Sequence, residues 1–267
     1  MCIIEAIKAR RSVRTYDGRA VDDALLLQLM AESALWGNPF NIPVSFRLLD
    51  AKEHGLVCPV VVGTEQYVGG KVQNVPYANA AFGYSFEQLV LRAQELGLGT
   101  VWLGGTMNRA AFEKAMELGE DEIMPCASPL GYPAEKMSVR EVMMRKAIKA
   151  DERLDFGALF FDGDAATPLL REKAGALALP LEMVRLAPSA ANKQPWRIIV
   201  KDGTAHFYCK RSKSMGGGRV DMQMVDMGIA LCHFALTAKE CGLDVEFLQE
   251  DPGLAEDMEY VASYRVK

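Results

Sequence analysis

The spacing of apolar residues predicts several helices along the chain. Apolar side chains recur at helical intervals within residues 2–10 and 25–30, and Asp22 or Asp23 can cap the second of these helices. From 80 to 96 the apolar positions describe one long, largely buried helix that ends at a glycine. These three segments predict a helical layer in the first part of the chain.

Continuous apolar runs predict the strands. They lie at 44–49, 56–62, 123–130 and 196–200. Residues 70–78 have the composition of a loop, and Asp202–Gly203 is a strong hairpin signal. Three further helix starts are indicated by cap residues: Asn108, Ser138 with Glu141 in a capping box, and Thr167 with Pro168.

The second half of the chain repeats the first. Residues 30–34 align with 183–187, 82–98 with 227–243 without a gap, and 121–128 with 256–263. A chance similarity between two apolar helices is the alternative, but the shared order of helix, loop, strand, long helix and strand favours duplication. We therefore expect two half-repeats, 1–153 and 167–267, joined by a packed linker over 154–166.

Composition and charge exclude several classes of function. Half of the 267 residues are apolar and the net charge is −5, which argues against a nucleic-acid surface. No run reaches the ~20 apolar residues that span a bilayer, and charged residues interrupt the N-terminal stretch, so we expect neither a membrane segment nor a signal peptide. The six cysteines are scattered without a CxxC, which predicts reduced thiols, a cytoplasmic location and no metal site.

Two polar stretches carry candidate chemistry. Arg10, Arg11 and Arg14 lie within five residues, interleaved with Ser12, and would repel one another unless an anion such as phosphate sits among them. The alternative is a solvated basic helix end. Residues 187–196, AlaProSerAlaAlaAsnLysGlnProTrp, form a loop of amide and hydroxyl groups that suits a flat polar ligand, with an ordinary polar turn as the alternative.

The amino-acid sequence of this loop resembles the PSxxNxQPW loop of the FMN-dependent nitroreductase superfamily. Residues 5–16, with the arginine-serine-arginine arm, 97–105, with a glycine pair, and 131–136 resemble three further parts of that family. The resemblance implies an α+β, nitroreductase-like fold, in which each half has a mostly antiparallel sheet with flanking helices. It also implies FMN as cofactor and NADH or NADPH as electron donor.

Members of this family are usually homodimers with FMN between two subunits. Here the first half has the arm, the glycine pair and the basic tail, whereas the second half has the PSxxNxQPW loop. The resemblance therefore implies a fused pseudo-dimer, a monomer that assembles one FMN site from its two halves.

The resemblance also implies roles for single residues. Arg10, Ser12 and Arg14 would hold the FMN phosphate, with Arg11 joining them or turning outward. One of Arg145, Lys149 and Arg153 would also reach the phosphate, and we favour Arg153. The remaining contacts would come from two loops: Pro188, Ser189 and Ala190 at the ring edge, Asn192 at the pyrimidine portion, and Leu103, Gly104 and Gly105 near the flavin N5.

The implied activity is NAD(P)H-dependent reduction of a small electron-poor acceptor, such as a nitroaromatic or a quinone, by a ping-pong mechanism. No side chain need act as acid or base, because the flavin carries the redox chemistry. A flavin-storage protein and a relic of the fold that no longer binds flavin are the alternatives. Residues 215–218 are expected to be a flexible loop, with a flap over the site as the alternative.

Overall fold

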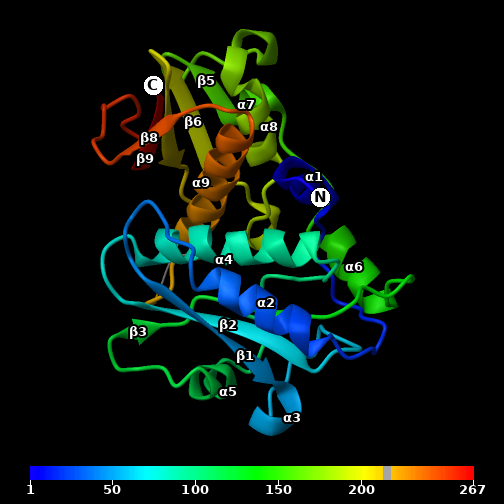
Figure 1. Cartoon of the computed structure of the whole chain (residues 1–267). Helices are drawn as coiled ribbons and strands as arrows, with labels where there is room; N and C mark the ends of the chain where they lie inside the picture. Colours follow the sequence, from blue (N-terminus) through cyan, green and yellow to red (C-terminus); the bar gives the residue numbers. More distant parts are fainter. Residues whose placement is uncertain (213–217) are drawn as a thin grey trace.

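The computed structural model describes residues 1–212 and 218–267. Most of the expected loop or flap at 215–218 therefore lies outside the described residues. The described chain has an α+β fold built on two separate sheets, with two long helices between them (Figure 1).

The first sheet is antiparallel and belongs to the first half of the chain. Its strands are β1 (Val44–Asp50), β2 (Gln66–Gln73), β3 (Glu122–Ile123) and β4 (Ala127–Leu130). Strand β2 is central, because it pairs with β1 along one edge and with both β3 and β4 along the other.

The second sheet has the order β5-β6-β7-β9-β8. Its strands are β5 (Phe160–Asp162), β6 (Trp196–Lys201), β7 (Thr204–Cys209), β8 (Val245–Leu248) and β9 (Glu259–Val266). All its pairs are antiparallel except β5 with β6. The fold class predicted from the sequence is confirmed.

The helices surround and separate the two sheets. They are α1 (Ile3–Ala9), α2 (Asp23–Ser33), α3 (Ala51–His54), α4 (Ala78–Glu95), α5 (Arg109–Ala115), α6 (Val139–Ala147), α7 (Phe156–Leu159), α8 (Ala178–Arg185) and α9 (Met222–Glu240). Within the described ranges, none of them is long and apolar enough to cross a membrane.

Helices α4 and α9 cross in the middle of the molecule (Figure 1). Two glycines, Gly83 and Gly228, lie at this crossing. A Cβ on Gly83 would overlap the carbonyl oxygen of Val225, and a Cβ on Gly228 would overlap that of Ala80. Only glycine allows two backbones to approach this closely. The two glycines occupy matching positions in the repeat, so the reciprocal contact supports the duplication, which itself stays a prediction.

Several predicted elements are confirmed. The structure has helices at the expected positions in α1, α2 and α4, and Asp22 caps α2 by accepting from the Ala24 N–H at 2.8 Å. Strands β1 and β6 and the hairpin at Asp202–Gly203 are also confirmed.

The expected strand over 56–62 is wrong. Leu56 and Cys58 are buried in a local apolar cluster, but Pro59 has no N–H to donate, and the segment forms turns. The true second strand, β2, includes part of the expected loop at 70–78. Its Gly69 and Gly70 look like loop residues, yet a Cβ there would lie 2.5 Å from the Met116 sulfur and 2.8 Å from the Phe82 ring, so packing requires glycine.

Two further boundaries differ from expectation. Residues 123–130 form two short strands rather than one, and Pro125 lies in the break. Pro168 forms a bridge with Phe161 instead of starting a helix, and α8 begins ten residues later at Ala178. Within the expected linker, α7 and β5 are formed, and β5 joins the edge of the second sheet. The division into halves at 154–166 stays a prediction.

The crossing makes a testable prediction about stability. Replacing Gly83 with alanine forces α4 away from α9, and we expect a loss of about 1–3 kcal/mol in the free energy of unfolding. Gly37→Ala is the matched control, since its Cβ would meet nothing within 4 Å. Urea unfolding of both variants measures the difference; equal midpoints would contradict a backbone contact at Gly83.

Candidate functional site

The predicted arginine arm is an extended segment that follows α1. The Val13 N–H donates to the Thr100 carbonyl at 2.8 Å, and the Tyr16 N–H donates to the Val62 carbonyl at 2.8 Å. The Tyr16 hydroxyl donates to the Val13 carbonyl at 2.8 Å. The arm is therefore held by its backbone, which leaves its arginine side chains available for other contacts.

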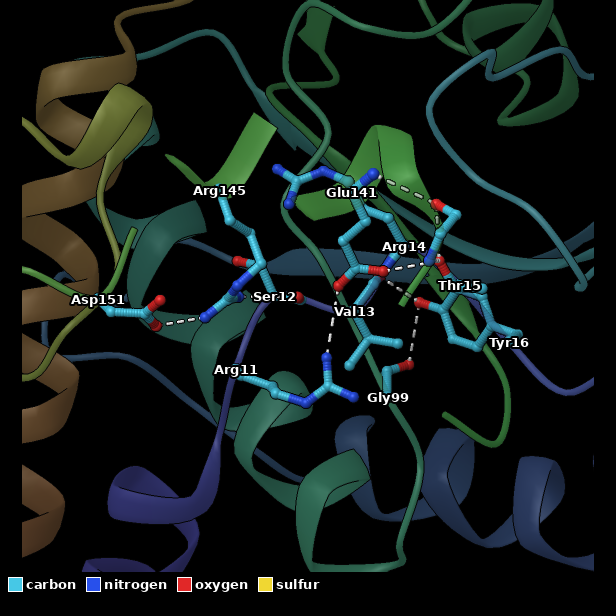
Figure 2. Close-up of polar contacts among 11 residues, drawn as sticks. Arg11, Ser12, Val13, Arg14, Thr15, Tyr16, Gly99, Glu141, Arg145 and Asp151 are labelled. Atoms are coloured by element: carbon cyan, nitrogen blue, oxygen red, sulfur yellow. Dashed lines mark hydrogen bonds and ion pairs between the residues drawn. The ribbon is translucent and has the colours of Figure 1, made fainter. Parts of the chain in front are cut away.

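A buried carboxylate of α6 fixes the arm from the other side (Figure 2). Glu141 accepts the Arg14 N–H at 3.2 Å and the Thr15 hydroxyl at 2.8 Å, and it pairs with Arg11 at 3.4 Å. Ser138 caps α6 as predicted, by accepting from the Glu141 N–H at 3.2 Å. The Glu141 side chain does not complete the expected capping box, because it is turned to the arm instead.

Two of the three candidate basic residues after Lys136 line the same cavity as the arm. Arg145 donates to the Ser12 carbonyl at 3.3 Å and pairs with Asp151 (Figure 2). Arg153 donates to the Ala150 carbonyl at 2.9 Å and faces the Asn192 side chain at 3.5 Å. Lys149 is 71% exposed and pairs with Glu152 on the surface. The structure thus adds Arg145 to the candidate site, beside Arg153, which the sequence analysis favoured.

These arginines line one cavity of about 210 Å³. The predicted site residues in its wall are Arg10, Arg11, Ser12, Arg153, Pro188, Ser189 and Asn192. Arg145 and Lys8 add two further cations, and Asp151 is the one carboxylate among the lining residues. The excess of positive charge makes this cavity a candidate anion site.

The arginines of the cavity lack partners for some of their N–H groups. Within the described ranges, the buried Nε and Nη1 of Arg10 and the buried Nε of Arg153 have no hydrogen-bond acceptor. The Arg10 side chain is 4% exposed, and its nearest carboxylate, Glu87, lies 4.0 Å from Nε. Burial lowers the pKa of Arg10, which Glu87 partly offsets and Arg145 reinforces. Burial and the charge of Arg10 lower the pKa of Arg153. An anion among these groups would remove both penalties.

The PSxxNxQPW loop forms the opposite wall and is fixed by its own polar groups. Ser189 Oγ accepts the Gln194 N–H at 2.9 Å, and Asn192 donates to the Lys149 and Glu152 carbonyls at 2.7 and 2.9 Å. Asn192 therefore fixes the backbone of the segment that precedes Arg153. Its position in the sequence did not indicate this role. Its predicted contact with a flavin pyrimidine stays a prediction.

The other predicted residues lie outside the cavity. Arg14 is buried, and its Nε and Nη1 have no acceptor among the described residues. Leu103 pairs with Ala127, and the Gly105 backbone is exposed. Ala190 donates to Asp226 at 3.0 Å.

The start of α9 links the loop to the glycine pair. Asp226 accepts the Ala190 N–H, and Met222, one turn earlier on the same face, packs against Gly104. A Cβ on Gly104 would lie 3.1 Å from the Met222 sulfur. The glycine pair and the PSxxNxQPW loop, about 85 residues apart, are thus brought to one end of one helix.

A buried carboxylate joins the arm, Trp102 and α9. Glu87 accepts from Trp102 Nε1 at 3.0 Å and lies 2.9 Å from His233 Nε2. His233 Nδ1 lies 2.8 Å from the Met183 carbonyl, which accepts only, so Nδ1 carries a proton. Glu87 also faces Arg10, so it connects the cavity with the helix crossing.

Sequence reasoning missed Glu87, Glu141 and Asp226. A usable signal existed for Glu87 and Asp226, because each is an acidic residue within the buried stripe of an apolar helix. Glu141 gave no signal, since its position fits an ordinary capping box. No group of three or more potential metal ligands is present in the described part of the chain.

Comparisons with known proteins identify the class and the family. The fold is that of nitroreductases: a structure described as a putative nitroreductase from Thermotoga maritima matches 100% of this chain and 93% of its own, with a TM-score of 0.64 and 20% identity. The family model described as "Putative TM nitroreductase" matches residues 2–238, and the chain belongs to this family. The predicted membership and its coarse class, an oxidoreductase, are confirmed.

A curated relative extends this comparison. A protein of Methanothermobacter thermautotrophicus named "Putative NADH dehydrogenase/NAD(P)H nitroreductase" is 28% identical over 166 residues, which cover 53% of this chain and 83% of the relative. The activity in this name is that of the relative.

The contacts of Glu141 predict how its variants unfold. Glu141→Ala leaves the Arg14 N–H and the Thr15 hydroxyl without this acceptor, so we expect a loss of about 2–4 kcal/mol in the free energy of unfolding. Glu141→Gln retains an acceptor oxygen and should lose less than half as much. Urea unfolding tests both variants, and an equal loss would show that the charge, not the hydrogen bonds, anchors the arm.

The buried Asp226 predicts a pH dependence. Burial raises the pKa of this carboxyl well above its usual range, although the Ala190 N–H lowers it in part. Since the folded chain keeps a proton that the unfolded chain releases near pH 4, stability falls as pH rises toward the folded pKa. Asp226→Asn cannot ionise, so its stability relative to the parent should rise from pH 5 to 8, by at most about 1.4 kcal/mol per pH unit. Urea unfolding across this range measures it, and a constant difference would contradict a protonated Asp226.

Proposed function

We propose that the chain binds one FMN and acts as an NAD(P)H-dependent oxidoreductase on small electron-poor acceptors. The observation that carries the proposal is the cavity in which Arg10, Arg11, Arg145 and Arg153 converge. Its buried guanidinium N–H groups lack acceptors among the described residues, and a phosphate dianion supplies acceptors of matching geometry and charge. The donor set therefore fits the phosphate of FMN.

The side chains of this chain would hold the cofactor at three places. Arg10, Arg145 and Arg153 would bind the phosphate, while Ser12 and Ser189 offer hydroxyl groups in the same cavity. Residues 188–190 would lie against the ring edge. Residues 103–105 would lie near its reactive atom, because the first turns of α9 join these two segments.

Bound FMN supplies the exchange of hydride and electrons between NADH or NADPH and the acceptor. The chain's own residues would orient the reactants and exclude water, so we assign no catalytic acid or base. Donor and acceptor would occupy the same space in turn, which gives ping-pong kinetics. Nitroaromatics and quinones are the proposed acceptors.

The site needs both parts of the chain. The arm and Arg153 lie in residues 1–153, whereas Ser189 and Asn192 follow the linker, and all of them line the same cavity. This arrangement supports a monomer with one site, formed from two fused halves. A cytoplasmic location is proposed with it, from the scattered free cysteines.

The experiment is a flavin titration. We expect the parent protein to retain about one FMN per chain, and Arg10→Ala to weaken binding by roughly tenfold or more, since a charge-assisted hydrogen bond contributes about 1.5–3 kcal/mol. Arg265→Ala removes the same charge from an exposed side chain of β9 and is the control. Fluorescence quenching of FMN measures both affinities.

Three results would count against the proposal. Binding of two flavins would contradict a single composite site, and no binding would favour the relic. Retention of FMN without NADH or NADPH consumption in the presence of a nitroaromatic would favour storage.

A further inference from the structure

Arg109, the first residue of α5, binds the carbonyl of the glycine pair. Its Nη2 donates to the Gly104 carbonyl at 2.5 Å and to the Pro125 carbonyl at 3.2 Å. Its Nη1 donates to the Met124 carbonyl at 2.6 Å and lies 3.4 Å from a carboxylate oxygen of Glu113. One guanidinium thus joins the glycine pair to the connection between β3 and β4.

These contacts place a fixed cation beside the peptide unit of Gly104 and Gly105. The Gly104 carbonyl and the Gly105 N–H belong to the same peptide, so a charge-assisted bond at the carbonyl polarises the N–H. A Cβ on Gly105 would meet nothing within 4 Å, so this edge of the loop is open. Gly105 is exposed, so accessible space borders this peptide.

We infer that Arg109 is a positioning residue that also sets the electrostatic field at the redox centre. This inference rests on the proposed function, in which residues 103–105 lie near the reactive atom of FMN. Reduction adds negative charge to the cofactor, and a cation one peptide away stabilises that charge. Arg109 therefore raises the reduction potential of the bound flavin.

A purely structural role for Arg109 predicts a different result. If the guanidinium only fastens the loop, its loss lowers stability and leaves the potential unchanged. The potential therefore separates the two roles, and it is measured without turnover.

The test is the midpoint potential of FMN bound to the full chain, measured by equilibration with a reference dye. We expect Arg109→Gln to shift the potential to a more negative value, and Arg109→Lys, which keeps the charge, to stay nearer the parent. Arg47→Gln is the control, because Arg47 is an exposed arginine on β1 paired with Glu117.

A second variant should shift the flavin potential in the opposite direction while leaving Arg109 and its bonds to the loop carbonyls in place. Glu113 is half-buried on α5 and partly neutralises Arg109. Glu113→Gln should shift the potential to a less negative value, so the inference can be tested even if Arg109→Gln fails to fold.

The inference is overturned if Glu113→Gln leaves the potential unchanged. It is also overturned if folded Arg109→Gln matches the parent, or if the lysine variant shifts as far as the glutamine variant. Failure of the proposed function is a separate result, since the parent protein would then bind no FMN before any variant is compared.

Discussion

The architecture depends on the contact between two helix backbones at Gly83 and Gly228. Because neither residue has a side chain, α4 and α9 approach closely enough for buried polar groups to pair across the crossing. Glu87 of α4 meets His233 of α9 at 2.9 Å, and the same carboxylate faces Arg10 and Trp102. The crossing therefore does more than join two helices. It sets the distance between the arginine arm, the glycine pair and the start of α9, which carry the candidate site.

Acidic residues position the basic ones throughout this site. Glu141 holds the backbone of the arm, Asp151 pairs with Arg145, and Asp226 holds the PSxxNxQPW loop through Ala190. Among the residues that line the cavity, Asp151 is the one carboxylate, and Lys8 and four arginines exceed it in charge. Local pairing and a remaining excess of cations are therefore compatible, and the cavity keeps its preference for anions.

Much of the fold and part of the site could be predicted from the sequence. Periodicity was enough for α1, α2 and α4, since a buried helical stripe leaves a regular pattern. It failed at β2, where Gly69 and Gly70 are required by the packing of Met116 and Phe82 and so look like loop residues. The arm and the loop could be located because their residue order resembles motifs of the nitroreductase family, whereas their residue types alone left a basic helix end and a polar turn open. Glu141 could not, because its partners lie about 127 residues away and no local pattern encodes such a contact.

The cavity draws its walls from one continuous polypeptide, and this changes how it responds to concentration. A cleft between separate subunits disappears as the protein is diluted and the subunits part, so its occupancy depends on two equilibria. Here the arm and the PSxxNxQPW loop remain tethered at any dilution, and the closure of the cavity is an intramolecular event. Closing the cavity then needs no second subunit. Each wall can also change by mutation without the same change appearing in the opposite wall.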